Sequence, residues 1–576
     1  MVPAAVLSSP AIYQKPTIAP SRGRAAGIVE SWTVALVLAG LIALHVAYAF
    51  VYRVDSDEPQ HLHVVWGVAQ GLVQYRDIFD NHSPLFQMLC APLMAAIGEH
   101  AWIVIPMRMA MTPLYIADLL LVWLIARSLY PRQWAPWMAI VTGCVPLFFL
   151  VTTEFRPDDL WTTLWLAAVW VAVGGPLQGR RAFLFGLLMG FCFSVSMKTM
   201  LLFAAAGTAG AGLLALHALS RRKLELRALL KNGGLILTGL VIVPGLLVAF
   251  FAAHGPVALR QMYYCVIQHN FTPGLGKGAK AGFHLWLFPL SLAPLFGLGW
   301  LCMHSSADER IGGGRALIAM TCVAYYFLLR SYWPLVTTQD AEPMLPLLAL
   351  SVLPFLFHLL SLPKWNVRAA IPAAAALLLA VEAALIWRMQ SPLDNKVIPF
   401  NQDLAAVLRL TNPTDLVMDG KGESIFRNRP IYWVLEGVTI KRIQLGLIPD
   451  DVKEKIINTS TCVALDHRLR GQDSDWLHQN FLEGDHKVWV AGKKLGPVRP
   501  TIAFHTDIQA RYSIVSDKGK LAGKLDGAPL RDSQQIAAGD HLLELNSGAG
   551  NVALVWSQAL ERGFSPFAKA TPEDSE

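Results

Sequence analysis

The sequence predicts a polytopic α-helical membrane protein of about eleven transmembrane helices, followed by a soluble region that begins near residue 391. Only 15% of its 576 residues are charged and 54% are hydrophobic, whereas a soluble domain has about 25% charged residues. Apolar segments recur between residues 28 and 389, each close to the roughly 20 residues that cross a bilayer. No apolar run of that length follows residue 391.

The order of apolar and basic segments predicts the topology. Arginines and lysines gather in alternate connections, which favours a cytoplasmic location for those connections. The first loop and everything beyond Ser391 are then expected on the opposite, outer face of the membrane. Residues 1–27 have no apolar core and are predicted to be a disordered cytoplasmic tail. The expected spans, within a membrane domain of residues 28–390, lie near 28–52, 101–126, 134–152, 159–177, 182–197, 200–219, 232–253, 283–303, 315–333, 343–361 and 369–389.

The C-terminal region is predicted to contain two parts. Residues 391–500 alternate short buried strands with helices, which indicates an α/β domain. Residues 501–576 contain strand patterns separated by turn residues such as Asp526-Gly527, which indicates a β-sandwich. The strands expected are 415–419, 461–465, 487–491, 510–515, 524–529, 541–545 and 551–556, and the helices are 451–458 and 474–481.

Asp57 and Glu58 are the first candidates for catalysis, because they follow the first span directly. A carboxylate at the edge of the membrane is costly unless it faces water or a cavity, and it can accept a proton from an acceptor hydroxyl. The alternative is a helix cap at Ser56 or Asp57 with Pro59 in the first turn. Residues 60–71 then predict a helix that lies in the membrane interface.

Further polar residues on the expected outer face form candidate binding groups. Asp77 and Asp80 could orient an acceptor or a sugar hydroxyl, and His82 could contact a phosphate; the alternative is a polar turn. Arg156 and Asp158 open a later span, where an acidic residue also caps helices ordinarily. The remaining candidates are Lys198 and Arg260 for the carrier phosphate, and His269 and Asn270 for the sugar or acceptor, with Lys277 and Lys280 in the same loop.

Other classes of site are not expected. The seven cysteines are scattered without metal-ligand spacing, so no structural zinc is predicted. No cofactor is predicted with certainty; a divalent Mg or Mn ion held by Asp57 and Glu58 stays open. The net charge of +7 is not gathered on a basic face with interleaved aromatic residues, so nucleic acid is not an expected partner.

Several elements of the sequence also resemble a known family. The resemblance covers about residues 30–500 and places the chain with the GT-C class of membrane glycosyltransferases. Within that class it is similar to the glycosyltransferase family 39-like branch of aminoarabinose transferases and protein O-mannosyltransferases. The residues that carry the resemblance are Asp57-Glu58, Phe79–Leu85, Arg156–Asp158, Gly190–Lys198, Asp340–Pro343 and Leu345–Leu347.

The resemblance implies a function and a location. The donor would be a sugar linked to polyprenyl phosphate, and the acceptor a cell-envelope glycan, lipid, lipopolysaccharide or protein outside the bacterial inner membrane. Asp57 would be the base, and Glu58 would help to bind the acceptor or a metal. His82 stands where aminoarabinose transferases have a lysine that meets the carrier phosphate, and histidine is only partly cationic near neutral pH.

Two other functions remain compatible with the sequence. A lipid-linked sugar transporter or flippase predicts ionisable residues deep in several helices and an internal repeat; Arg108 and Asp118 are the main mid-span charges, and no repeat is found. A non-catalytic envelope-glycan assembly protein would use the C-terminal β region as its working part.

The alternating charges give a testable topology. Reporter fusions at Arg181 and Arg310 should report a cytoplasmic location, and fusions at Asp80 and Gly420 a periplasmic one, because basic loops are retained on the inner side. Paired alkaline phosphatase and green fluorescent protein fusions measure this. A cytoplasmic signal at Asp80 would place the expected base and the carrier phosphate on the wrong side of the membrane.

Overall fold

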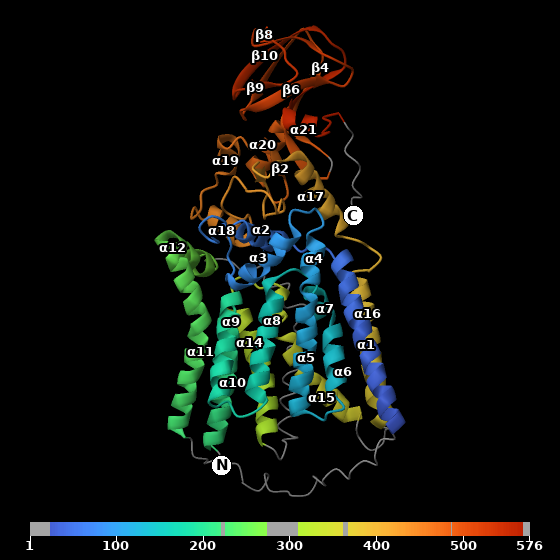
Figure 1. Cartoon of the computed structure of the whole chain (residues 1–576), viewed down its shortest axis with the longest axis vertical. Helices are drawn as coiled ribbons and strands as arrows, with labels where there is room; N and C mark the ends of the chain where they lie inside the picture. Colours follow the sequence, from blue (N-terminus) through green and yellow to red (C-terminus); the bar gives the residue numbers. More distant parts are fainter. Residues whose placement is uncertain (1–23, 220–224, 273–308, 361–366, 485, 568–576) are drawn as a thin grey trace.

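The computed structural model describes the chain except residues 1–23, 220–224, 273–308, 361–366, 485 and 568–576. Long helices run side by side in one half of the molecule, and a strand-rich domain forms the opposite end (Figure 1). Short helices, including α2 (Glu58–Ala69), α3 (Leu85–Ile97), α12 (Pro256–Tyr263) and α18 (Gly437–Gln444), lie between the two.

The helical half follows the expected spans. The predicted span 283–303 lies outside the described residues, and every other predicted span coincides with one helix or with two consecutive helices. These helices are α1 (Arg24–Val51), α4 (Val104–Met109), α5 (Thr112–Leu129), α6 (Ala135–Cys144), α7 (Pro146–Val151), α8 (Pro157–Val173), α9 (Arg180–Val195), α10 (Thr199–Leu219), α11 (Leu226–Ala253), α14 (Glu309–Tyr332), α15 (Leu345–Leu360) and α16 (Val367–Met389).

Six segments of the described chain are long and apolar enough to cross a membrane, namely α1, α4 with α5, α10, α11, α14 and α16. Others are shorter; α8 and α9 have 17 and 16 residues. The chain is therefore a multi-pass membrane protein, and the number of eleven spans stays a prediction.

Small residues allow a close helix contact between α9 and α11. A Cβ at Gly186 would lie 2.0 Å from the backbone oxygen of Ile236, and one at Gly239 would lie 2.4 Å from that of Phe183. Neither glycine can be replaced without moving a backbone. Such contacts are common where membrane helices pack without a hydrophobic driving force.

The helix α2 is not the interfacial helix that the sequence predicts. Residues Glu58 to Gly67 are all buried. Leu62 and Val65 belong to the core of the bundle, while the ring Nδ1 of His63 lies 2.8 Å from the carbonyl oxygen of Ile425 in the C-terminal domain. One face of α2 therefore packs on the bundle, and the opposite face meets the C-terminal domain and not water.

The C-terminal domain begins with α17 (Ile398–Leu410) and contains most of the expected elements. A seven-stranded sheet has the order β1-β2-β4-β11-β6-β9 with β3 beside β4, and a four-stranded sheet has the order β5-β10-β7-β8. The strands are β1 (Val417–Met418), β2 (Val463–Leu465), β3 (Phe481–Glu483), β4 (Val488–Pro497), β5 (Thr501–Thr506), β6 (Ala510–Ser516), β7 (Ala522–Leu525), β8 (Ala528–Pro529), β9 (Gln534–Ile536), β10 (Gly539–Ser547) and β11 (Asn551–Trp556), with helices α19 (Val452–Asn458), α20 (Gly471–Asn480) and α21 (Ser557–Glu561).

The larger sheet runs across the boundary predicted at residue 500. Strands β4 and β11 pair in antiparallel fashion, from Asn551 opposite Pro497 to Val555 opposite Gly492, so the α/β part and the sandwich part share one sheet. The two sheets pack on a common core. The expected turn at Asp526-Gly527 joins β7 to β8 with positive φ at both residues, as a tight hairpin requires.

Candidate active site

A polar cavity lies where the helical half meets α18 and the short outer helices. Its walls come from loops and helix ends that are far apart in the sequence. Its volume of about 80 Å³ has room for a few water molecules. The cavity is lined by Asp57, Asn81, His82, Ser83, Arg156, Ser196, Met197, Lys198, Asn270, Trp333, Pro334, Leu335, Thr337, Asp340, Glu436 and Val438.

Asp57 enters this cavity with both carboxylate oxygens paired to cations. Arg156 Nη1 lies 2.8 Å from Oδ2, and the ammonium of Lys421 pairs with Oδ1. Burial by itself raises the pKa of Asp57, but Arg156 and Lys421 outweigh burial and hold that pKa well below its ordinary value. Asp57 is therefore ionised at any pH near neutrality.

At the start of α2, the side chains of Asp55 and Glu58, and not that of Asp57, accept hydrogen bonds from backbone N–H groups. Asp57 stands at the N-cap of α2, but its side chain makes no capping hydrogen bond. The Asp55 carboxylate accepts the N–H of Asp57 at 3.0 Å, and the Glu58 carboxylate accepts the N–H of Asp55 at 2.8 Å. This reciprocal pair resembles a capping box and leaves the Asp57 carboxylate available to the cavity.

Arg156 and Lys198 extend the ion pairs along the cavity wall. Arg156 Nε lies 3.2 Å from Asp158 Oδ2, and Lys198 Nζ lies 3.3 Å from Asp158 Oδ1 and also pairs with Asp340. We define the charge row as Lys421, Asp57, Arg156, Asp158, Lys198 and Asp340, in which cations and carboxylates alternate. Each buried charge in the row lies beside a charge of opposite sign, and this pairing offsets the free-energy cost of removing the charge from water.

His82 borders the cavity and is oriented by Asp80. Its ring Nδ1 lies 2.8 Å from Asp80 Oδ1, and its side chain stays 22% exposed. Asp80 is fully buried and also accepts hydrogen bonds from Gln74 and Gln87 at 2.8 and 2.9 Å. Contrary to the expectation of an acceptor-binding group, the Asp80 carboxylate lies outside the cavity lining and holds its own loop together.

Glu58 likewise differs from its expected function. Its carboxylate is fully buried, with Arg108 Nε 2.7 Å from Oε1 and Arg108 Nη2 on Oε2, and it also accepts the N–H of Phe155 at 2.7 Å. Arg108 donates further to the carbonyls of Tyr52 and Arg53, both at 2.7 Å. Glu58 therefore joins the end of α1, the start of α2 and the Arg108 helix and does not face the cavity.

The other expected site residues divide into two groups. Asn270 lines the cavity and donates to the carbonyl of Asn81 at 2.8 Å. His269 lies just behind it, buried, with Nε2 3.3 Å from Glu436 Oε1. Asp77 pairs with Arg76 on an exposed turn, and Arg260 is exposed on α12; neither lines the cavity. Lys277 and Lys280 lie outside the described residues.

Lys421 and Glu436 are site residues that the sequence did not reveal. Both belong to the C-terminal domain, more than 360 positions from Asp57. The only local signal at Lys421 is its place between two glycines, and that pattern says nothing about where the loop docks. Asp340 belongs to the Asp340–Pro343 segment that carries the family resemblance, but the sequence assigns it no function in the site.

Asp57 and Glu58 do not form a shared ligand set for a divalent cation. Asp57 is paired with Arg156 and Lys421, whereas both oxygens of Glu58 are taken by Arg108 and by backbone N–H groups. Among the residues that the structure describes, no group of three or more His, Cys, Asp or Glu side chains is arranged to hold a metal ion.

Comparisons with known proteins identify the fold. No family model matches the chain, and no curated protein matches it. The crystal structure of ArnT from Cupriavidus metallidurans bound to undecaprenyl phosphate is similar over 76% of this chain and 93% of that chain, with a TM-score of 0.53 and 12% sequence identity. Its apo state gives a TM-score of 0.51 at 13% identity over the same shares. The chain therefore has a GT-C-like fold.

The Glu58–Arg108 pair should be essential for stability. Arg108→Met leaves the Glu58 carboxylate buried without a cation and should lower the free energy of unfolding by about 3–5 kcal/mol. Thermal unfolding in detergent measures the loss. The double variant Glu58→Gln/Arg108→Met should be more stable than Arg108→Met alone, because it removes the unpaired charge.

Arg76→Met provides the control. Arg76 pairs with Asp77 at 2.7 Å, and both side chains are partly exposed, so its loss should change stability by at most about 1 kcal/mol. Equal losses in Arg76→Met and Arg108→Met would show that the buried pair contributes no more than a surface pair.

Proposed function

We propose that this protein transfers a sugar from a polyprenyl-phosphate-linked donor to a cell-envelope acceptor at the outer face of the bacterial inner membrane. The observation that carries the proposal is one cavity bordered by an ionised carboxylate, Asp57, and by three potentially cationic side chains, Arg156, Lys198 and His82. A carboxylate suits proton removal from an acceptor, and a group of cations suits a phosphate leaving group.

The reaction is a single displacement with inversion at the anomeric carbon. The acceptor oxygen or nitrogen forms a bond to that carbon while the bond from the carbon to the phosphate oxygen breaks. The acceptor proton passes to Asp57, and polyprenyl phosphate leaves with the bonding electron pair. Lys198 and His82 then offset the charge that develops on the phosphate.

The surroundings of the cavity agree with such a reaction. Asn81 and Asn270 add amide groups that can hold sugar hydroxyls, and Glu436 brings the C-terminal domain to the cavity wall. The similar ArnT structure contains undecaprenyl phosphate, which supports a lipid-linked donor as the class of substrate. The charge pattern of the loops supports a periplasmic position of the cavity.

Transport of a lipid-linked sugar is a second candidate, and one observation favours it. Asp118 in α5 and Asp159 in α8 are fully buried within the helical half, and in the described part of the chain Asp159 has no hydrogen-bond partner. Buried acids of this kind occur in transport pathways. A transporter leaves its substrate intact, so release of polyprenyl phosphate distinguishes the two functions.

Asp57→Asn should abolish most of the activity, because asparagine keeps the size of the side chain but cannot accept the proton. Asp57 also pairs with the buried cations Arg156 and Lys421, so thermal unfolding is measured first and turnover is compared at a temperature where the variant is folded. Turnover should fall by about 10²–10⁴-fold with little change in donor affinity. Release of labelled polyprenyl phosphate from a panel of hexosyl and pentosyl undecaprenyl phosphates, with a cell-envelope extract added as the source of acceptor, measures turnover at equal protein abundance.

Asp77→Asn is the control, because Asp77 is an exposed carboxylate of the same segment outside the cavity. It should keep wild-type turnover. Near-normal turnover in Asp57→Asn would remove Asp57 from the reaction and direct attention to Asp158. Absence of any polyprenyl phosphate release by the wild-type protein, across the panel, would contradict the proposed function itself.

Lys421 should determine the pH at which the base works. Asp57 must be ionised to accept a proton, so activity is lost as the pH falls through its pKa. Lys421→Met removes one of the cations that lower this pKa, and the acidic limb of the kcat/KM profile should move to higher pH by about one to three units.

Lys421→Arg keeps the charge and should leave the acidic limb close to that of the wild type. A general loss of activity without any movement of the limb in Lys421→Met would assign Lys421 to packing of the domain alone.

A further inference from the structure

A second polar region lies at the end of the helical half that is farthest from the candidate active site. Here a cavity of about 450 Å³ opens between the last turns of α5 and α8 and the first turn of α9. We name it the inner arginine cavity. Its lining is Leu124, Arg127, Ser128, Arg132, Trp170, Val171, Gly174, Arg181 and Leu184.

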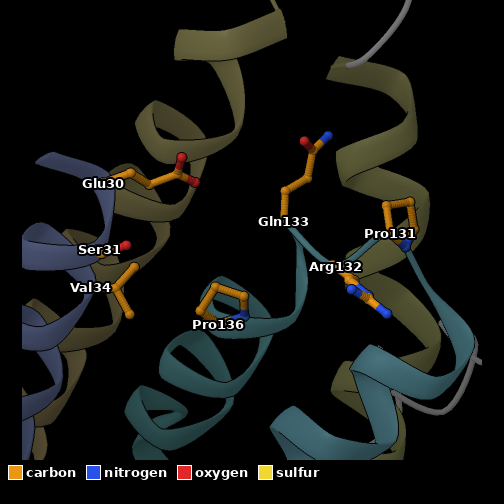
Figure 2. A pocket seen from close by; sticks show the side chains of 7 residues that line it. All are labelled: Glu30, Ser31, Val34, Pro131, Arg132, Gln133 and Pro136. Carbon is orange, nitrogen blue, oxygen red and sulfur yellow. The ribbon is translucent and has the colours of Figure 1, made fainter. Parts of the chain in front are cut away.

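A neighbouring cavity of about 710 Å³ adjoins it through Arg132, which lines both. Figure 2 shows Glu30, Ser31 and Val34 on one side and the Pro131–Pro136 segment on the other. Arg132 therefore stands between two hollow spaces at this end of the molecule.

Three guanidinium groups from three different segments converge on the inner arginine cavity. Arg127 lies in the last turn of α5, Arg132 in the turn that follows, and Arg181 in the first turn of α9. Three like charges around one space repel each other, and the repulsion grows as water is excluded. An anion in the cavity would remove this penalty.

The described part of the chain does not supply that anion. None of the three arginines has a carboxylate within ion-pair distance among the described residues. Arg127 lies over the ring of Trp123 at 5.1 Å, and Arg181 donates to the carbonyl of Val171. The Nε of Arg181 is buried without an acceptor. Arg132 makes no hydrogen bond or ion pair with any described residue, so its guanidinium is available to a ligand.

The same cavity also has an apolar wall. Trp170 and Leu184 line it and remain 39% and 42% exposed. These large apolar side chains stand on α8 and α9 beside the arginines, on helices whose other end reaches the candidate active site. A ligand with a phosphate and an adjoining hydrocarbon chain matches both parts, whereas a free phosphate uses only the arginines.

We propose that the inner arginine cavity binds an anionic glycerophospholipid of the adjacent membrane leaflet. Its headgroup phosphate would be held by Arg127, Arg132 and Arg181, and one acyl chain would run along Trp170 and Leu184. Basic pockets between membrane helices on the cytoplasmic side are suited to anionic headgroups. The site is separate from the proposed transfer reaction and does not depend on it.

The retention of basic residues on the inner side of a membrane explains why arginines occur at this end, but it does not require three of them to face one cavity. The experiment separates these explanations with two variants. Arg132→Gln removes a guanidinium that lines the cavity and has no partner in the described part of the chain. Arg180→Gln removes the neighbouring charge, which is exposed and lies outside the lining.

Purified, delipidated full-length protein is titrated with phosphatidylglycerol, with phosphatidylcholine of the same acyl chains, and with inorganic phosphate. Native mass spectrometry measures the lipid retained, and thermal unfolding measures the stabilisation. Phosphatidylglycerol should be retained and should raise the melting temperature, whereas the other two should not. Arg132→Gln should weaken phosphatidylglycerol binding about fivefold, and Arg127→Gln/Arg132→Gln about 25-fold, while Arg180→Gln should bind as the wild type does.

Three results would overturn the proposal. Equal retention of phosphatidylcholine would show that the arginines do not select the headgroup. Equal stabilisation by inorganic phosphate would identify a simple anion site without a lipid. Equal weakening by Arg180→Gln and Arg132→Gln would show that diffuse surface charge, and not this cavity, attracts the lipid.

Discussion

A charged group that leaves water must be paired, and this constraint organises the outer end of the molecule. The charge row alternates three cations with three carboxylates from Lys421 to Asp340. Its members come from helix ends, loops and the C-terminal domain, so the row can form only when all of these segments are in place. The buried Glu58–Arg108 pair joins the end of α1 to the start of α2, next to Asp57 of the charge row. Removing one charge therefore affects several distant segments together.

The same pairing affects the chemistry of Asp57. Arg156 and Lys421 keep its carboxylate ionised and fixed in direction, which favours proton transfer over a wide range of pH. They also lower its basicity, because a carboxylate with a low pKa holds a proton weakly. The proposed transfer from a phosphate-linked donor would suit this compromise, since a good leaving group lowers the demand on the base. Asp80 plays a comparable part for His82, whose ring it turns toward the cavity.

The C-terminal domain is part of the candidate site and not an appendage. The loop after β1 places Lys421 on Asp57, and Ile425 of the same loop contacts His63 of α2. A Cβ at Gly422 would lie 2.8 Å from the Cβ of His63, so this contact has no room for a side chain. The domain therefore closes one wall of the cavity and lowers the pKa of the proposed base.

The sequence by itself determined the features that depend on local pattern. Hydropathy located the apolar helices of the described chain, alternation located most strands, and the acidic pair after the first span made Asp57 and Glu58 candidates. It could not separate Asp57 from Glu58, because adjacent residues on a helix point in different directions and only packing shows which one meets Arg108. It could not find Lys421 either, since a contact between positions 57 and 421 leaves no local signal. Only the tertiary structure decided the pairs Glu58–Arg108 and Asp57–Lys421. A buried charge must be paired with an opposite charge, and the fold determines which one lies close enough.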